Sequence, residues 1–226
     1  MKTTLKRILI YTGIALFLIV AIPAINLFIF NKVSDRISEG SPIPEYDRER
    51  SALMVIDIQE YTTGAVAENA TYPKQADELI DRINVLSARA DSAGIPVIFI
   101  VAEVTNPLIN ILNSSLAPGS EGTQLDRRLH VTSPHVLTKN KNDAFTNPEL
   151  DTLLRNLKVN HLFLTGLDAS YCVNCTLRGA MNRGYQVSVI EDAVIAANPD
   201  QKTEMMKQFR ELGVKVTSSD QFPESP

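Results

Sequence analysis

The sequence has few of the residues that bind metals or form disulfides. Among its 226 residues there are two cysteines and three histidines, too few for a disulfide-stapled scaffold or a zinc finger. The net charge is −4 and no basic stripe occurs, so we expect no nucleic-acid partner. Internal repeats and low-complexity tracts are absent as well. What remains suits one globular domain, because 44% of the residues are hydrophobic and a chain of this length can bury a full core.

The first 32 residues differ in character from the rest. Residues 8–30 form an uncharged run of 23, preceded by Lys2, Lys6 and Arg7. At about 1.5 Å per residue, such a helix crosses a hydrocarbon core of roughly 30 Å. A cleaved signal peptide has a shorter apolar region and a small-x-small cleavage site, whereas the small residues of "AIPA" have the wrong spacing. We therefore predict that residues 1–32 are a single membrane-anchoring helix, with a signal peptide as the alternative.

The charges around this run predict its orientation. Positive charge is greater on the N-terminal side, and Asp35 and Glu39 follow the run. The positive-inside bias then places the N-terminus in the cytoplasm and the following domain on the exported side, periplasmic or extracellular. Residues 33–50 are polar and contain one glycine and two prolines, a composition that predicts a tether between the anchor and the domain.

From residue 51 onward, two hydrophobic periodicities alternate. Short apolar runs predict buried strands, at residues 52–58, 97–104, 135–139, 161–167, 186–194 and 214–217. Between them, apolar stripes with Asn or Pro at the first positions predict helices, beginning at Pro73, Pro148, Cys172 and Pro199.

This alternation predicts the fold class. Strands and helices in turn over residues 51–222 indicate an α/β domain with three layers, α/β/α, around a mainly parallel, doubly wound sheet. In such sheets, ligands bind beyond the carboxyl ends of the strands. The longest connection, residues 105–134, is expected to be functional or partly helical.

Three reactive side chains fall at that edge. Asp57 lies near the end of the first strand, Lys139 at the end of the third, and Cys172 just after the fourth. Each has an ordinary explanation alone, as a turn cap, a solvated lysine or a small core residue. Their joint placement at one edge of the sheet indicates a catalytic site.

The chemistry of the three residue types is complementary. A thiolate is the nucleophile, and the pKa of a free thiol, about 8.5, has to be lowered to supply it. A helix N-terminus and a nearby lysine both favour the anion, so we predict a lowered pKa for Cys172. A carboxylate can take the thiol proton and return it to a leaving group. The set predicts acyl transfer through a thioester.

Three segments carrying these residues resemble a known family. "VIDIQ", "LTKNKNDAF" and "TGLDASYCVNCTLRGAMNRGYQVSVIEDAV" are similar to the signature segments of the isochorismatase-like cysteine hydrolases, which include nicotinamidases and N-carbamoylsarcosine amidases. The resemblance covers residues 50 to 222. It implies that Asp57 is the general base, Lys139 the electrostatic partner and Cys172 the nucleophile. It also implies a non-proline cis peptide at Leu167–Asp168, with the N–H groups of Asp168 and Cys172 as oxyanion donors.

The departures from the family narrow the expected activity. Nicotinamidases of this family carry a metal site built from an Asp and several His residues after the first strand, whereas no histidine precedes His130 here. The sequence therefore disfavours a nicotinamidase, and we expect no metal or other cofactor. Cys172 favours hydrolysis of a small amide, ureide or related carbonyl compound. Vinyl-ether hydrolysis driven by Asp57 remains an alternative.

The second cysteine leaves one further alternative open. Cys175 follows Cys172 by three residues at a helix start, an arrangement that also occurs in redox pairs. We interpret Cys172 as the nucleophile and Cys175 as a neighbour without a catalytic role. The alternative is a non-catalytic or redox-regulated exported binding domain that uses the Cys172/Cys175 pair. The remaining candidates flank the motifs and are expected to line a pocket for a small-molecule substrate: Tyr61, Asn142, Phe145 and Tyr171. A homo-oligomer is left open.

Overall fold

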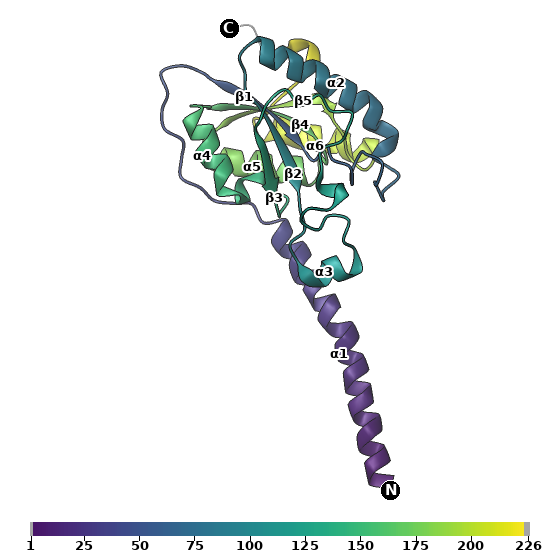
Figure 1. The fold of residues 1–226 in the computed structure, drawn as a ribbon. Coiled ribbons are helices and arrows are strands. Elements are labelled where there is room, and N and C mark those ends of the chain that lie inside the picture. Colours follow the sequence, from purple (N-terminus) through teal and green to yellow (C-terminus); the bar gives the residue numbers. More distant parts are fainter. Residues whose placement is uncertain (1, 224–226) are drawn as a thin grey trace.

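The structure is a computed structural model and describes residues 2–223. Its centre is one sheet of six parallel strands in the order β3-β2-β1-β4-β5-β6 (Figure 1). The strands are β1 (Ser51–Ile56), β2 (Val97–Ala102), β3 (Val136–Lys139), β4 (His161–Gly166), β5 (Gln186–Val194) and β6 (Lys215–Thr217). All six predicted strands are present, with ends that differ from the predicted ones by up to two residues. The α/β prediction is confirmed.

Helices cover both faces of the sheet. One face carries α2 (Pro73–Ser92), and the other carries α4 (Pro148–Asn156), α5 (Cys172–Asn182) and α6 (Pro199–Glu211). The apolar run of β1 divides between them by its period of two. Its residues 52, 54 and 56 pack with α4, α5 and α6, and residues 53 and 55 pack with α2. A strand buried on both faces needs the continuous apolar run from which it was predicted.

The helix starts follow from their sequences. Both α4 and α6 begin with an Asn-Pro pair. The side chains of Asn147 and Asn198 accept hydrogen bonds from the N–H groups of Glu149 (2.9 Å) and Gln201 (2.8 Å). The asparagine thus caps free N–H groups, and the proline occupies the first turn, where it loses no hydrogen bond.

The direction of chain winding reverses between β1 and β4, the two central strands. Such a reversal opens a crevice at the carboxyl ends of the strands. Gly166 ends β4 beside β1 with φ 108, and a Cβ there would collide with the backbone of Ile56. The next residue, Leu167, donates its N–H to the carbonyl of Ile56 at 3.0 Å. Glycine therefore allows the loop after β4 to start directly against the end of β1.

The N-terminal helix α1 (Lys2–Ser34) projects away from the sheet (Figure 1). Its segment Leu9–Ser34 is long and apolar enough to cross a membrane, a criterion that a signal sequence can also meet. None of its apolar window is buried within the protein. The helix continues two residues past the predicted anchor end at residue 32.

Residues 35–50, predicted as part of a tether, contain no helix or strand but bind the domain. Ser38 donates from its N–H and its hydroxyl to Oδ2 of Asp143, at 2.8 and 2.6 Å. Ile43 donates its N–H to the carbonyl of Arg183 at 2.9 Å and packs against the core. The segment is therefore fixed to the domain, which its polar composition did not predict.

The long connection between β2 and β3 is partly helical, as expected. It contains α3 (Pro107–Leu112) and a 3-10 helix at Glu121–Thr123. Two further 3-10 helices lie at Ala144–Thr146 and Ser219–Gln221. The α3 helix contacts α1 and lies beside its domain-proximal end (Figure 1).

Candidate active site

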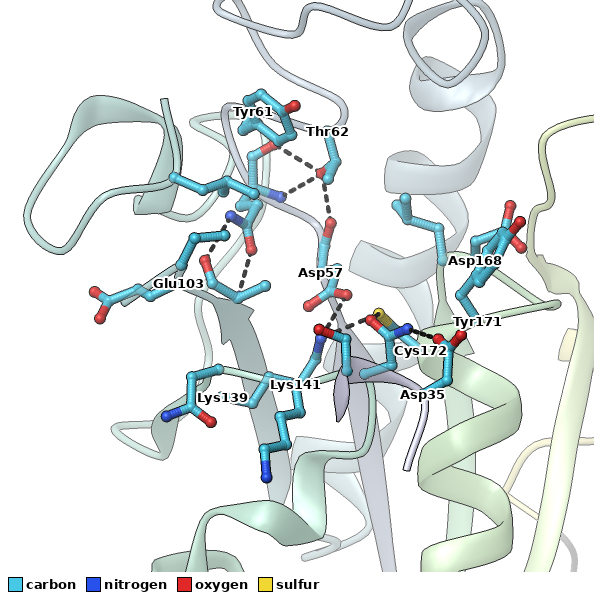
Figure 2. A pocket seen from close by; sticks show the side chains of 18 of the residues that line it. Asp35, Asp57, Tyr61, Thr62, Glu103, Lys139, Lys141, Asp168, Tyr171 and Cys172 are labelled. Atoms are coloured by element: carbon cyan, nitrogen blue, oxygen red, sulfur yellow. Dashed lines mark hydrogen bonds and ion pairs between the residues drawn. The ribbon is translucent and has the colours of Figure 1, made fainter. Parts of the chain in front are cut away.

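The three predicted catalytic side chains meet at the crevice (Figure 2). Asp57 directly follows β1, Lys139 ends β3, and Cys172 begins α5 after β4. The Nζ atom of Lys139 lies 2.9 Å from Oδ2 of Asp57 and 3.1 Å from Sγ of Cys172. Because β2 separates β3 from β1, the contact needs a long side chain such as lysine. One ammonium group therefore bridges a carboxylate and a thiol.

Asp57 is held in an unusual backbone conformation. Its φ of 57 is in the left-handed region, which residues other than glycine seldom adopt. The neighbouring backbone secures it, because Asp57 N–H donates to Ile100 O at 2.8 Å and Thr62 Oγ1 donates to Asp57 O at 2.5 Å. Residues held this way cluster at active sites. The turn directs the carboxylate toward Lys139 instead of into the core.

The second oxygen of Asp57 is an unused acceptor. Asp57 is 4% exposed, and its Oδ1 is buried without a hydrogen-bond partner among the described residues. Buried polar atoms are nearly always paired, and leaving one unpaired costs about 1–3 kcal/mol. An unpaired carboxylate oxygen facing a cavity is suited to receive a proton from a substrate or a nucleophile.

The protonation of Cys172 differs from the prediction. Burial raises the pKa of its thiol above the ordinary 9.0, and the Asp57 carboxylate raises it further, while the Lys139 ammonium only partly offsets both. Burial lowers the pKa of Lys139, but the charges of Asp57 and Cys172 outweigh it, so the net pKa is above the ordinary 10.5. The resting site therefore holds a neutral thiol beside a buried Asp57–Lys139 ion pair. The predicted lowering fails because it counted the cation and the helix end but neither the burial nor the carboxylate.

The loop that precedes Cys172 contains the cis peptide between Leu167 and Asp168. Tyr72 Oη donates to Oδ2 of Asp168 at 3.0 Å. The N–H of Ala169 donates to the carbonyl of Ile195 at 3.0 Å. These bonds attach the loop to the start of α2 and to the end of β5. The role of the Asp168 and Cys172 N–H groups as oxyanion donors stays a prediction.

A cavity of about 550 Å³ opens over these groups. Of the predicted pocket residues, Tyr61, Asn142 and Tyr171 line it. Phe145 differs from the prediction, because it is 3% exposed and lies in the core. Its ring packs 5.6 Å from that of Tyr185 and 4.6 Å from the Arg183 guanidinium. Phe145 follows Asn142 by three residues, and nothing in the sequence there indicated that its side chain turns into the core.

Gln59 is a buried polar residue that the prediction missed. Its Nε2 donates to the carbonyls of Ala102 (3.1 Å) and Gly122 (2.9 Å), and its Oε1 accepts from the N–H of Ala102 (2.7 Å). It thereby joins the end of β1 to the end of β2 and to the connection that follows β2. A polar residue two positions after Asp57 in an apolar run was the available signal.

The cavity also has a wall that no sequence pattern indicated. The end of α1 and the residue after it contribute four lining residues: Phe30, Asn31, Ser34 and Asp35. Asp35 lies beside Cys172 in Figure 2, although it is distant from every motif along the chain.

Two alternatives from the sequence remain, a redox pair formed by Cys172 and Cys175 and a metal site like that of nicotinamidases. Both thiols are free; Cys175 is 5% exposed, and its Sγ lies 4.0 Å from the carbonyl of Asp35. Across the described part of the chain, no three His, Cys, Asp or Glu side chains gather as metal ligands, and no histidine lines the cavity. These donor groups do not fit the metal site of nicotinamidases.

Comparisons with known proteins concern the domain as a whole. A model of the Isochorismatase domain matches residues 51–221. A ureidoacrylate amidohydrolase, RutB of Klebsiella pneumoniae, is 30% identical over 178 residues, which are 67% of this chain and 75% of that protein.

Two solved structures are similar as well. The N-carbamoylsarcosine amidase of Thermoplasma acidophilum has a TM-score of 0.65 and 28% identity, over 77% of this chain and 99% of that one. Nicotinamidase PncA of Bacillus subtilis has a TM-score of 0.62 and 26% identity, over 75% of this chain and 99% of that one.

Proposed function

Because this chain belongs to the isochorismatase family, whose members are hydrolases, we propose that it hydrolyses a small amide or ureide through a thioester at Cys172. One observation carries the proposal. The Lys139 ammonium lies 2.9 Å from the Asp57 carboxylate and 3.1 Å from the Cys172 sulfur. The carbonyl of a substrate in the cavity can then meet a nucleophile, a base and a fixed positive charge together.

The first half of the reaction forms the thioester. Oδ1 of Asp57 takes the proton of Cys172 while Sγ attacks the carbonyl carbon, so the base and the nucleophile act in one step. The carbonyl electron pair moves onto oxygen, where the N–H groups of Asp168 and Cys172 stabilise it. When the intermediate collapses, the C–N bond breaks and the nitrogen leaves with the proton held by Asp57. Lys139 remains charged throughout, and it stabilises negative charge on the Asp57 carboxylate and on the Cys172 sulfur.

The second half restores the enzyme. A water molecule gives a proton to Asp57 and attacks the thioester carbon. The C–S bond then breaks, and the sulfur recovers its proton from Asp57. One water is consumed, and one amine or ammonia and one acid are released. Cys172 can serve as nucleophile despite its raised pKa, because it loses its proton only as it attacks.

The names of the relatives support the bond type. A ureidoacrylate amidohydrolase and an N-carbamoylsarcosine amidase both act on C–N bonds beside a carbonyl. We extend this bond type, and no particular substrate, to the present chain. We also propose that α1 is a retained anchor with the domain on the exported side, because Lys6 and Arg7 precede its exposed apolar segment, Leu9–Ser34.

The test compares variants of the full chain in nanodiscs by ammonia release from a panel of primary amides and ureides. Cys172→Ala should lower turnover by at least about 10³-fold, since it removes the nucleophile. Cys175→Ser is the matched control and should retain turnover. Undiminished ammonia release by Cys172→Ala would exclude the thioester at Cys172.

A further inference from the structure

The end of α1 lies outside the domain that this chain shares with its relatives, yet it lines the cavity. The family match begins at residue 51, and the N-carbamoylsarcosine amidase is matched over 99% of its length by 77% of this chain. Phe30, Asn31, Ser34 and Asp35 all precede the matched region. These residues therefore form a wall of the cavity that the shared domain does not contain.

A chain of hydrogen bonds leads from this wall to the nucleophile. The Asn142 N–H donates to the carbonyl of Ser34 at 3.0 Å, and Asn142 Nδ2 donates to Oδ1 of Asp35 at 2.6 Å. A carboxylate can only accept, so it takes the NH₂ end of the Asn142 amide. The carbonyl end, Oδ1, is then directed to Cys172, whose thiol donates to it at 3.5 Å.

The helix also presents one selected apolar side chain to the cavity. Phe28 and Ile29 are 62% and 54% exposed, whereas Phe30 is half-buried and lines the cavity. Val104 and Leu116 line the same cavity. Phe30 thus supplies an apolar surface beside which part of a substrate can lie.

We propose that the end of the N-terminal helix is a working part of the active site. Asp35 is a positioning residue that orients Asn142 toward Cys172, and Phe30 selects substrates with an apolar group remote from the reacting carbonyl. This inference rests on the proposed function, because it assigns Cys172 as the reacting group. The helix that would anchor the protein then also shapes its specificity.

The positioning role is tested by alkylation of Cys172, which needs no substrate. In the full chain in nanodiscs, iodoacetamide labelling at pH 7 is followed by mass spectrometry of the Cys172 peptide. Asp35→Ala frees the Asn142 amide to rotate, and the thiol then loses its hydrogen bond to Asn142 Oδ1. Labelling should then be about two- to fivefold faster, corresponding to about 0.5–1 kcal/mol for a weak hydrogen bond.

Three variants separate positioning from general damage. Asp35→Asn keeps an acceptor for Nδ2 and should restore the wild-type rate. Asp35→Ala should have no further effect in an Asn142→Ala background, since the two residues act through one contact. Glu45→Gln, an exposed change in the same segment, should leave labelling unchanged. Additive effects of Asp35→Ala and Asn142→Ala would overturn the assignment.

The specificity role is tested with two probes, iodoacetamide and N-hexyl iodoacetamide. Phe30→Ala should lower the rate ratio of the hexyl probe to the small probe, and Phe28→Ala should not, although both remove a phenyl ring from α1. Equal ratios in both variants would overturn this role. Failure of the proposed function gives a different result, namely turnover that survives Cys172→Ala.

A second observation concerns α3, and it rests on α1 being retained as an anchor. Its Ile111 and Leu112 are 78% and 75% exposed, and Leu108 is 36% exposed. The helix contacts α1, and it lies beside the end of α1 nearest the domain (Figure 1). Residues 9–30 of α1, at about 1.5 Å per residue, fill a hydrocarbon core of roughly 30 Å. The boundary of that core then falls at the level of α3.

We infer that α3 lies in the lipid interface, with Ile111 and Leu112 inserted among the headgroups and upper acyl chains. The chain has no tryptophan, so one introduced tryptophan is an unambiguous reporter. Ile111→Trp in nanodiscs that contain brominated phosphatidylcholine should be quenched relative to unbrominated discs. Val131→Trp, at a 51% exposed position shortly before β3, should not be. Equal quenching, or none at Ile111→Trp, would overturn the inference.

Discussion

Two groups in the site, the Asp57 carboxylate and the Cys172 thiol, share the single ammonium of Lys139. The thiol is neutral at rest because burial and the Asp57 charge raise its pKa more than Lys139 lowers it. Asp57 therefore has two opposite effects on Cys172. Its charge opposes the thiolate, and its free oxygen removes the thiol proton during attack.

Asp57→Asn separates these effects. Removing the carboxylate charge leaves Lys139 to stabilise the thiolate alone, so the pKa of Cys172 falls toward or below the ordinary 9.0. Iodoacetamide labelling of Cys172 at pH 7 should become faster, because more thiolate is present. Turnover should nevertheless drop by about 10²–10⁴-fold, the usual contribution of a general base.

The pH dependence of Cys172 labelling tests whether Asp57 raises or lowers the pKa of the thiol. In the wild type, labelling should still be rising above pH 9.0, and in Asp57→Asn the rise should begin at lower pH. Glu103→Gln removes a carboxylate that lines the same cavity and should leave the profile in place. A labelling rate that falls in Asp57→Asn would show that Asp57 favours the thiolate.

Lys139→Met should act in the opposite direction on the same thiol. The ammonium lowers the pKa of Cys172, so its loss should slow labelling and shift the profile to higher pH. It also leaves the buried Asp57 charge unpaired, which costs about 3–5 kcal/mol. Urea unfolding should therefore show a lower free energy of unfolding, and the labelling shift is measured below the unfolding transition.

At the scale of elements, the end of β4 depends on Gly166. Alanine there would need a positive φ, which costs about 1–2 kcal/mol, and its Cβ would also collide with the Ile56 backbone. We expect Gly166→Ala to lower the melting temperature and to abolish turnover, because the loop before Cys172 starts at that point.

Gly213→Ala is the matched control for Gly166→Ala. Gly213 also has a positive φ, 81, but an added Cβ would meet nothing within 4 Å. It should incur only the backbone cost and retain turnover. If both variants lose the same stability and keep activity, the close approach of Gly166 to β1 is not required.

The segment between α1 and β1 is a second element whose contacts can be measured. Burial raises the pKa of Asp143, and hydrogen bonds from Ser38 lower it in part. An acid with a raised folded pKa loses stability as pH rises from its ordinary value of 3.8 through the folded one. Ser38→Ala removes a donor from the charged form, so its cost of about 1–3 kcal/mol should be larger at pH 7 than at pH 4. Urea unfolding at the two pH values measures the difference.

The whole molecule combines an α/β domain with one exposed apolar helix. If α1 is retained as an anchor, the chain should stay with the membrane fraction after alkaline carbonate washing. Protease added to spheroplasts should cleave the domain, since Lys2, Lys6 and Arg7 before the apolar segment Leu9–Ser34 favour an exported C-terminal part. Recovery of the domain in the soluble fraction with residues 1–32 removed would instead identify a signal peptide.

The sequence predicted the helices and strands well, and the surroundings of individual side chains less well. Strands, helix starts and the meeting of Asp57, Lys139 and Cys172 follow from local periodicity, from capping chemistry and from the rule that parallel strands end at one edge. Phe145 was misassigned because its position beside a motif gives no information on whether its ring faces a cavity or a core.

What remained hidden in the sequence depends on contacts between distant segments. The strand order β3-β2-β1-β4-β5-β6 sets which side chains share the crevice, and burial there reverses the expected direction of the Cys172 pKa. The bond from Asn142 to Asp35 joins residues 107 positions apart. Local patterns reveal which residue types can react. Desolvation and the identity of the opposite wall arise only when the chain is folded, because both are properties of everything packed around a group.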